Sequence, residues 1–249
     1  MISVIIPTAD RPMEYLGAAL DSVLAQTLQP SEILVMDNGR TPVDPARLPQ
    51  GVTLVRLPPR VGPSRARNAG AAVARGTHLA FLDDDDWWEP GFLREAARVA
   101  EEGGFRIVYG RKDQSDDGVV TPHKTPRPDR MTVAVLLRRN PCTGGQNLYI
   151  EAALFARIGG FDERLRYAED RALALEALLA GERIGCAPDA VAILRNHRGS
   201  RLRQHRARRA RFVWKYRRLR PAREVASDLW GIGVSALRQM LPTLRPARR

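Results

Sequence analysis

The chain has 249 residues, 44% of them hydrophobic, and a formal net charge of +12 at pH 7. This length is enough for one large domain with a buried core, or for one domain plus an appendage. No apolar run approaches the roughly 20 residues of a membrane-spanning helix, so we expect no helical span. The first residues, MISVIIPTADRP, show no basic leader before the short apolar run. We therefore expect no secretory signal and a cytoplasmic protein.

The positive charge is concentrated near the end of the chain. Residues 195–249 contain 17 Lys and Arg against two acids, Glu224 and Asp228, whereas the first 194 residues contain 23 bases and 26 acids. A basic tail on a nearly neutral body favours contact with a polyanion, either the anionic face of a membrane or nucleic acid. The alternative is that the tail helices only pack on the rest of the chain, with solvated arginines outside.

The two cysteines, Cys142 and Cys186, have neither metal-ligand spacing nor a disulfide framework around them. This agrees with a reducing compartment, and it favours small buried apolar side chains over nucleophiles.

Strands and helices alternate in the first third of the sequence. Apolar runs predict strands, and apolar residues at helical spacing predict helices. The strands are expected at 3–6, 32–37, 52–57 and 77–82, and the helices at 11–27 and 62–76. This alternation predicts an α/β fold with a doubly wound, mostly parallel sheet flanked by helices.

The remaining sequence predicts a less regular order of elements. We expect a helix at 90–102, a strand at 105–110, a mobile polar loop at 114–130, a helix at 129–139, a strand at 148–150, a helix at 169–180, and short strands at 183–186 and 191–194. Two basic helices follow at 205–220 and 223–241, separated by Pro221. We therefore expect one domain over residues 1–200 and a basic amphipathic helical extension over 201–249.

The most unusual stretch is AFLDDDDWWEP, residues 80–90, in which four aspartates follow an apolar strand. Neighbouring carboxylates repel one another, so a positive partner is expected, and carboxylate oxygens suit Mg²⁺ or Mn²⁺. If the chain stays extended, Asp83 and Asp85 face one side and Asp84 and Asp86 the other. The alternative is a solvated acidic turn that caps the next helix.

Polar residues follow three of the predicted strands. Thr8, Asp37 with Asn38, and the four aspartates all lie at or just beyond the end of a strand. Ligands of doubly wound sheets gather beyond the carboxyl ends of the strands. We therefore expect these side chains to line one cleft.

The motifs SVIIPTADRP, EILVMDNG, ARNAGAAVARG, FLDDDDWWEP, GGFDERLRYAED and RNHRGS occur in this order over roughly residues 2–200. Their order resembles that of the family-two glycosyltransferases of the GT-A fold. The resemblance implies inverting transfer of a sugar from a nucleotide-diphosphate donor to an acceptor hydroxyl, assisted by Mn²⁺ or Mg²⁺. It also implies a role in bacterial cell-surface glycan or glycoconjugate synthesis.

The resemblance assigns several residues to the donor. Pro7 and Thr8 match a nucleotide-contacting turn, although a plain strand-ending turn is the alternative. Asp37 and Asn38 match a pair of acids, and an amide in the second place can still pair with a pyrimidine edge, so UDP or dTDP sugars are expected. Arg67 would hold phosphate or order the acidic turn, unless it is a surface helix arginine.

Within the acidic stretch, the resemblance places Asp83 near the donor and Asp85 on the metal as an Asp-x-Asp motif, with Asp84 assisting. Asp86 is interpreted as a cap for the next helix. Trp87 and Trp88 either wall the sugar pocket or belong to the core.

The resemblance also assigns the proton transfer and the remaining ligands. Asp170 matches the catalytic base and Glu169 would orient it, although acids in the first turn of a helix are also favoured by the helix dipole. Gly145 and Gln146 would border the acceptor, which is a glycan, a lipid-linked sugar or a small molecule. His197 would bind the metal or the diphosphate, with a structural histidine as the alternative.

Three other functions remain open on the sequence. A sugar nucleotidyltransferase uses a related sheet, but a GxGxR loop after the first strand is absent. A non-catalytic nucleotide-sugar-binding module is the second alternative. A transferase that modifies a base hydroxyl of nucleic acid is the third, and a lipid-linked acceptor would place the enzyme peripherally at the inner face of the membrane.

Overall fold

The structure, a computed structural model, describes residues 1–196 and 205–240. Its contacts divide the chain into two compact units. The first is formed by Met1–Glu163 and Glu169–His197, and the second by Arg164–Ala168 and Arg198–Arg249. The division of the chain into a domain over 1–200 and an extension over 201–249 stays a prediction.

The first unit is built on one sheet with the strand order β3-β2-β1-β4-β8-β6-β9-β5, and β7 pairs with β6 outside this path. Strands β3, β2, β1 and β4 run parallel to one another, β8 runs antiparallel to both β4 and β6, and β6 is parallel to β9. The strands are β1 Ile2–Thr8, β2 Glu32–Asp37, β3 Val52–Arg56, β4 His78–Phe81, β5 Trp87–Trp88, β6 Ile107–Asp116, β7 Val119–Lys124, β8 Leu148–Glu151 and β9 Ile184–Arg195.

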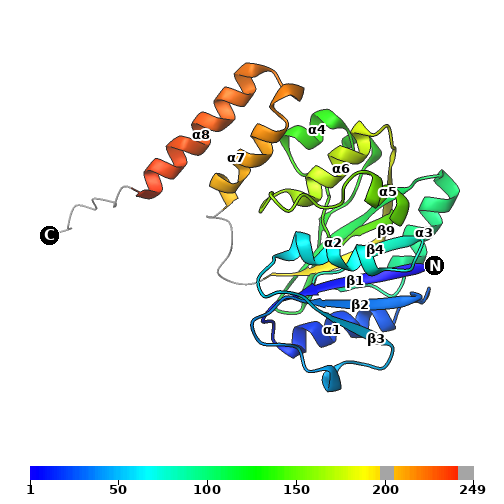
Figure 1. Cartoon of the computed structure of the whole chain (residues 1–249). Helices are drawn as coiled ribbons and strands as arrows, with labels where there is room; N and C mark the ends of the chain where they lie inside the picture. The colour runs from blue at the N-terminus through cyan, green and yellow to red at the C-terminus, as the bar shows by residue number, and fades with distance from the viewer. Residues whose placement is uncertain (197–204, 241–249) are drawn as a thin grey trace. The chain divides into compact units, whose positions relative to one another are not determined.

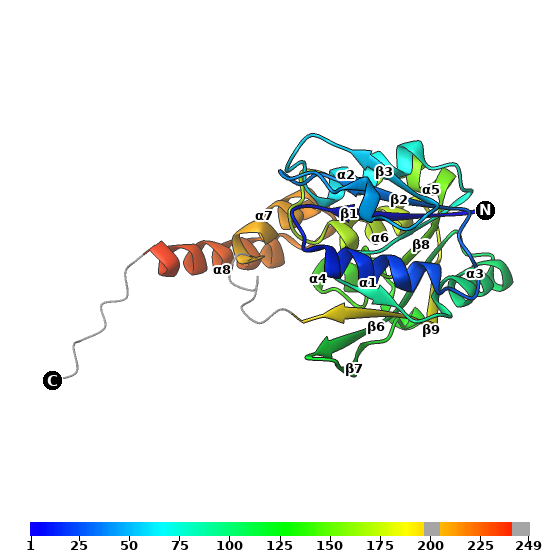
Figure 2. The same cartoon turned by 90° about the horizontal axis from the view of Figure 1, so that it is seen from below.

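Helices cover both faces of this sheet (Figures 1 and 2). The α-helices of the first unit are α1 Met13–Leu24, α2 Pro63–Val73, α3 Phe92–Gly103, α4 Val133–Arg138, α5 Ala152–Arg157 and α6 Glu169–Leu179, with 3-10 turns at Pro45–Arg47 and Pro128–Arg130. Val4 and Ile6 share a core with α1 and α3. Ile5 points to the opposite face, where a Cβ on Gly70 of α2 would lie 2.6 Å from Ile5 Cγ2. The mixed α/β architecture confirms the predicted fold class.

The predicted mobile loop over residues 114–130 is wrong. Residues 107–124 form a β-hairpin of β6 and β7, in which Asp116 pairs with Val119. The two residues between them, Asp117 and Gly118, have φ values of +49° and +90°. An Asp-Gly pair with two positive φ values is the favoured two-residue hairpin turn, so this pair was the sequence signal for the hairpin.

The strands predicted at 183–186 and 191–194 are present but not separate, because one continuous strand, β9, includes both apolar runs. Its pairing with β6 shifts in register between Gly110 and Arg111. This irregularity accommodates the polar residues that separate the two apolar runs of the sequence.

The second unit contains α7 His205–Lys215, a 3-10 turn at Arg217–Leu219 and α8 Ala222–Met240, which lie side by side (Figure 1). The two helices occur where the sequence predicts them, on either side of Pro221. Asp228 forms ion pairs with Arg209 at 3.2 Å and with Arg220 at 2.8 Å. Within residues 1–196 and 205–240, none of the helices combines the length and apolar character that crossing a bilayer requires.

Candidate active site

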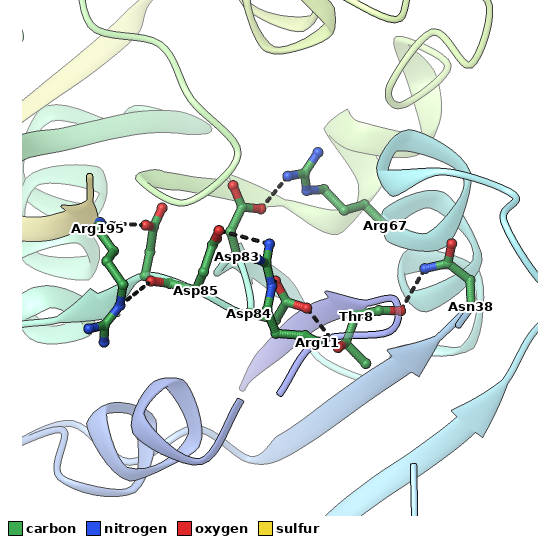
Figure 3. A network of polar contacts seen from close by, with 9 residues as sticks. Thr8, Arg11, Asn38, Arg67, Asp83, Asp84, Asp85 and Arg195 are labelled. Atoms are coloured by element: carbon green, nitrogen blue, oxygen red, sulfur yellow. Dashed lines mark hydrogen bonds and ion pairs between the residues drawn. The ribbon is translucent and has the colours of Figure 1, made fainter. Parts of the chain in front are cut away.

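The carboxyl ends of β1, β2 and β4 lie next to one another, and polar side chains gather there. Thr8 and Asp37 are paired in register at the ends of β1 and β2. The Thr8 hydroxyl donates to Asp84 Oδ2 at 2.7 Å, and Asn38 Nδ2 donates to the Thr8 carbonyl at 2.7 Å (Figure 3). The three groups that follow predicted strands therefore come together as expected.

The four aspartates form a turn, which we name the acidic turn (Asp83–Asp86). The amide of Asp86 donates to the Asp83 carbonyl at 3.2 Å, so the chain bends after β4. The chain does not stay extended after β4, so the condition for an alternation of the four side chains is not met. Arg11 Nε lies 3.2 Å from Asp84 Oδ1 and Arg11 Nη2 lies 2.8 Å from Asp85 Oδ2, so one guanidinium bridges adjacent carboxylates.

Guanidinium groups supply the positive partners that the acidic turn needs. Besides the Arg11 bridge, Arg67 forms an ion pair with Asp83 (Figure 3). Burial is the main cause that raises the pKa of Asp84, and the hydrogen bond from Thr8 and the charge of Arg11 oppose it. Sequence reasoning missed Arg11, although its position three residues after the end of β1 was the available signal.

Asp86 is not the helix cap that the sequence suggested. Helix α3 begins after Gly91 without a side-chain cap, because the short strand β5 separates the acidic turn from the helix. Asp86 Oδ1 instead accepts a hydrogen bond from the backbone amide of Arg195 at 2.9 Å. Burial, together with the charges of Asp83 and Asp85, raises the pKa of Asp86 well above its usual range.

Asp37 at the end of β2 and Asn38 after it hold the neighbouring loops. The Asp37 side chain is 1% exposed, and it accepts from the amides of Gly39 and Val43 at 2.9 Å and pairs with Arg56 at 2.7 Å. Asn38 Oδ1 accepts from the amide of Gly62 at 3.3 Å. Direct contacts of Asp37, Asn38 and the buried Pro7 with a donor stay predictions.

Arg67 links the acidic turn to the start of α6. Its side chain is 5% exposed, so the alternative of a surface helix arginine is wrong. Its Nη1 lies 4.0 Å from Glu169 Oε1, and its Cζ lies 5.2 Å from the centroid of the Phe161 ring. A Cβ on Gly145 would lie 2.8 Å from Arg67 Cζ. One buried guanidinium therefore contacts the predicted donor, base and acceptor segments.

Two acids stand at the first turn of α6. Burial, followed by the charge of Asp170, raises the pKa of Glu169 to about 7, and Arg67 opposes this shift. Asp170 Oδ2 accepts from Asn140 Nδ2 at 3.1 Å, and its Oδ1 accepts from the amide of Arg171 at 2.7 Å. Asp170 is thus fixed in orientation, and Glu169 titrates near neutral pH.

The loop of residues 143–147 is held by several hydrogen bonds. Trp88 Nε1 donates to the Gln146 carbonyl at 2.7 Å, and Lys112 Nζ and Asn140 Nδ2 both donate to the Thr143 carbonyl, at 2.8 and 2.7 Å. Trp88 is 2% exposed and stacks on Phe92, which favours the core over a sugar-pocket wall. Lys112 and Asn140 were not singled out from the sequence.

The carboxylates of the acidic turn are suitable ligands for a divalent cation. Among residues 1–196 and 205–240, no group of three or more His, Cys, Asp or Glu side chains is placed to hold a metal. Mg²⁺, however, is commonly bound through one or two carboxylates plus substrate phosphates, which requires no complete protein cage. Asp83 and Asp85 offer such carboxylates, whereas His197 lies outside the described residues.

The sequence matches the family described as "Glycosyl transferase family 2" over residues 3–160. An uncharacterized glycosyltransferase of Haemophilus influenzae is 28% identical over 185 residues, which cover 72% of this chain and 62% of the relative. The succinoglycan biosynthesis protein ExoO of Rhizobium meliloti is 32% identical over 198 residues, covering 73% of this chain and 57% of ExoO. The chain therefore spans about three fifths of the length of these relatives.

Solved structures share the fold. The S. aureus TarS 1-349 structure in complex with UDP-GlcNAc has a TM-score of 0.64 and 20% identity, covering 85% of this chain and 66% of TarS 1-349. The complex with UDP has a TM-score of 0.63. Because the family match extends over more than half of the residues, the chain belongs to glycosyl transferase family 2.

Proposed function

We propose that the chain is an inverting glycosyltransferase that moves a sugar from a UDP or dTDP donor to an acceptor hydroxyl in bacterial cell-surface glycan synthesis. The observation that carries this proposal is the convergence on Arg67 of Asp83, Glu169 and the Gly145 loop. The biosynthetic name of ExoO and the nucleotide-sugar complex of TarS support the donor class and the pathway type.

In this proposal, Asp170 is the base. It takes the proton of the acceptor hydroxyl as that oxygen attacks the anomeric carbon, and the bond from this carbon to the diphosphate oxygen breaks. A single displacement from the opposite face inverts the configuration. Asn140 and the amide of Arg171 hold the two carboxylate oxygens, which fixes the direction in which the proton is received.

Asp83 and Arg67 form the donor side of the proposed site, and Pro7, Thr8, Asp37 and Asn38 shape the nucleotide end. Asp83 is 29% exposed at its side chain, so it is accessible to a ligand, whereas Arg67 is buried behind it. Gly145 and Gln146 lie on the acceptor side in this assignment.

We also propose that Asp85, with Asp83 nearby and His197 as a predicted further ligand, holds Mn²⁺ or Mg²⁺. A bound divalent cation supplies positive charge for the leaving nucleoside diphosphate. The test is Asp85→Ala: sugar transfer that is unchanged in this variant, with and without added Mn²⁺, removes the metal assignment.

The donor is tested by incubating the protein with UDP, dTDP and GDP sugars in the presence of Mn²⁺ or Mg²⁺ and measuring released nucleotide. Release from a UDP or dTDP sugar is expected. Inactivity toward the whole panel, with nucleotide binding retained, would favour the non-catalytic binding module. Net formation of a nucleotide sugar from a sugar phosphate would instead favour the nucleotidyltransferase.

The second unit supports a peripheral position at the cytoplasmic face of a membrane. Its two acids are both ion-paired, Asp228 with Arg209 and Arg220, and Glu224 with Arg220 at 3.6 Å. The sequence of this unit contains many more arginines than acids. Trp214 and Trp230 are 59% and 76% exposed. Cations beside exposed tryptophans suit an anionic bilayer surface and a lipid-linked acceptor.

Sedimentation of the full chain with vesicles tests this membrane contact. Vesicles with anionic lipid should carry the protein down, neutral vesicles should not, and the double variant Trp214→Ser, Trp230→Ser should bind more weakly. Equal binding of the wild type to both kinds of vesicle, or no binding at all, would remove the membrane role. Binding to RNA or DNA at the same salt concentration would point to nucleic acid instead.

A further inference from the structure

We infer that Arg11 is an internal counter-ion of the acidic turn, which occupies Asp85 until a divalent cation takes its place. Arg11 is a positioning residue in this account, since it acts through the carboxylates. The inference rests on the proposed cation at Asp85, and it assigns to Arg11 the control of access to that cation site.

The two contacts of Arg11 reach two different side chains. Nε faces Asp84 at 3.2 Å, and Nη2 faces Asp85 at 2.8 Å (Figure 3). The Arg11 side chain is 23% exposed, whereas those of Asp84 and Asp85 are 9% and 10% exposed. A buried carboxylate without a positive partner is costly, so the bridge balances the acidic turn before any ligand arrives.

The two contacts are not equivalent. Asp84 is held at both oxygens, by the Thr8 hydroxyl at Oδ2 and by Arg11 Nε at Oδ1. Arg11 reaches Asp85 through a different nitrogen, Nη2. A cation that binds Asp85 therefore displaces the Nη2 contact, while Nε keeps the guanidinium attached to Asp84 beside the Tyr15 ring, whose centroid lies 5.9 Å from Cζ.

Electrostatics makes the two occupants of Asp85 compete. A guanidinium in contact with Asp85 and a divalent cation on the same carboxylate repel each other at short range. Arg195 is placed differently, because its Nε donates to the Asp85 backbone carbonyl at 3.3 Å and its guanidinium lies between the Tyr15 and Trp87 rings. Arg11 should therefore weaken cation binding to the nucleotide-free protein.

The test is a Mn²⁺ titration of the purified, nucleotide-free protein, with free Mn²⁺ measured by electron paramagnetic resonance. Arg11→Met should bind Mn²⁺ roughly fivefold more tightly than the wild type, the scale of a modest ion pair. Arg106→Met is the matched control, because it also removes one positive charge from a bridge between two acids, Glu151 and Glu182. It should leave Mn²⁺ affinity unchanged, and Asp85→Asn added to Arg11→Met should abolish the gain.

Equal or weaker Mn²⁺ binding by Arg11→Met than by the wild type would overturn the inference while leaving the proposed cation intact. A similar gain in Mn²⁺ affinity in Arg106→Met would also overturn the inference, because any pair of acids that loses its arginine would then bind Mn²⁺ more tightly. No Mn²⁺ binding by any variant, even with UDP added, would remove the cation proposal together with this inference. The donor panel tests the transferase separately. Nucleotide release from a UDP or dTDP sugar would support the transferase even if the Arg11 inference or the cation proposal failed.

Circular dichroism checks the fold of each variant. If Arg11→Met does not fold, Arg11→Lys decides the matter, because one ammonium group keeps the charge but cannot span both carboxylates as the guanidinium fork does. Arg11→Lys should also bind Mn²⁺ more tightly than the wild type, by a smaller factor. An unchanged affinity in folded Arg11→Lys would overturn the inference.

Discussion

Gly145 lies directly against the Arg67 guanidinium, and Gly145→Ala tests the convergence of the site with a single added methyl group. The new Cβ would lie 2.8 Å from Cζ and 2.9 Å from both Nε and Nη2 of Arg67. Ordinary contacts between such atoms begin near 3.5 Å, so the guanidinium must move by about 0.7 Å. An exposed arginine could move away freely, but Arg67 is held by Asp83 and by the Phe161 ring.

We expect both stability and activity to fall in Gly145→Ala. Overpacking of this kind costs about 1–3 kcal/mol, which lowers the melting temperature of a chain this long by roughly 2–12 °C. A displacement approaching 1 Å at a reactive site reduces the rate by about 10- to 100-fold. Thermal unfolding and nucleotide release from the best donor of the panel measure the two effects.

Gly17→Ala in α1 is the matched control, because a Cβ there meets nothing within 4 Å. It should keep the wild-type rate and gain up to about 1 kcal/mol from the better helix propensity of alanine. A wild-type rate and melting temperature in Gly145→Ala would refute the tight contact between Gly145 and Arg67.

Three further predictions concern stability, each measured by urea unfolding. Because the folded pKa of Glu169 is raised to about 7, the folded chain binds a proton that the unfolded chain loses above its usual pKa of 4.5. The free energy of unfolding should therefore fall by about 1–3 kcal/mol as the pH rises from 5 to 8. Glu169→Gln should make this fall smaller. An equal fall in the variant and the wild type would contradict the raised pKa of Glu169. Gly118→Ala, at φ +90° in open space, should lose about 1 kcal/mol, and an unchanged stability would argue against the hairpin turn. Asp37→Ala should lose about 2–4 kcal/mol, because Arg56 and two backbone amides lose their acceptor, and a loss below 1 kcal/mol would show that water replaces these contacts.

The sequence was sufficient for the parallel half of the sheet. Strands β1, β2 and β4 are short apolar runs bounded by polar turns, and buried strands of this kind have few alternatives. The β6–β7 hairpin was missed because its strand residues, such as Gln114 and His123, are polar. The Asp117-Gly118 turn carried the signal, but a two-residue signal was outweighed by the composition around it.

The sequence predicted which residues come together in the site better than it predicted their contacts. The ends of neighbouring parallel strands necessarily meet, which is why Thr8 and the acidic turn came together. Which arginine faces which carboxylate depends on the path of the turn after β4, and no local pattern encodes that path. The pairing of Asn140 with Asp170 joins residues 30 positions apart, so it required the folded chain.

Nucleotide binding and turnover, measured side by side in Asp170→Asn, separate the role of Asp170 as the base from donor binding. The isosteric amide removes the base and substitutes no residue of the donor side. Asp170→Asn is expected to bind UDP, by calorimetry, within about twofold of the wild type, while nucleotide release from the donor falls at least about 100-fold. Wild-type release by Asp170→Asn would contradict the assignment of Asp170 as the base.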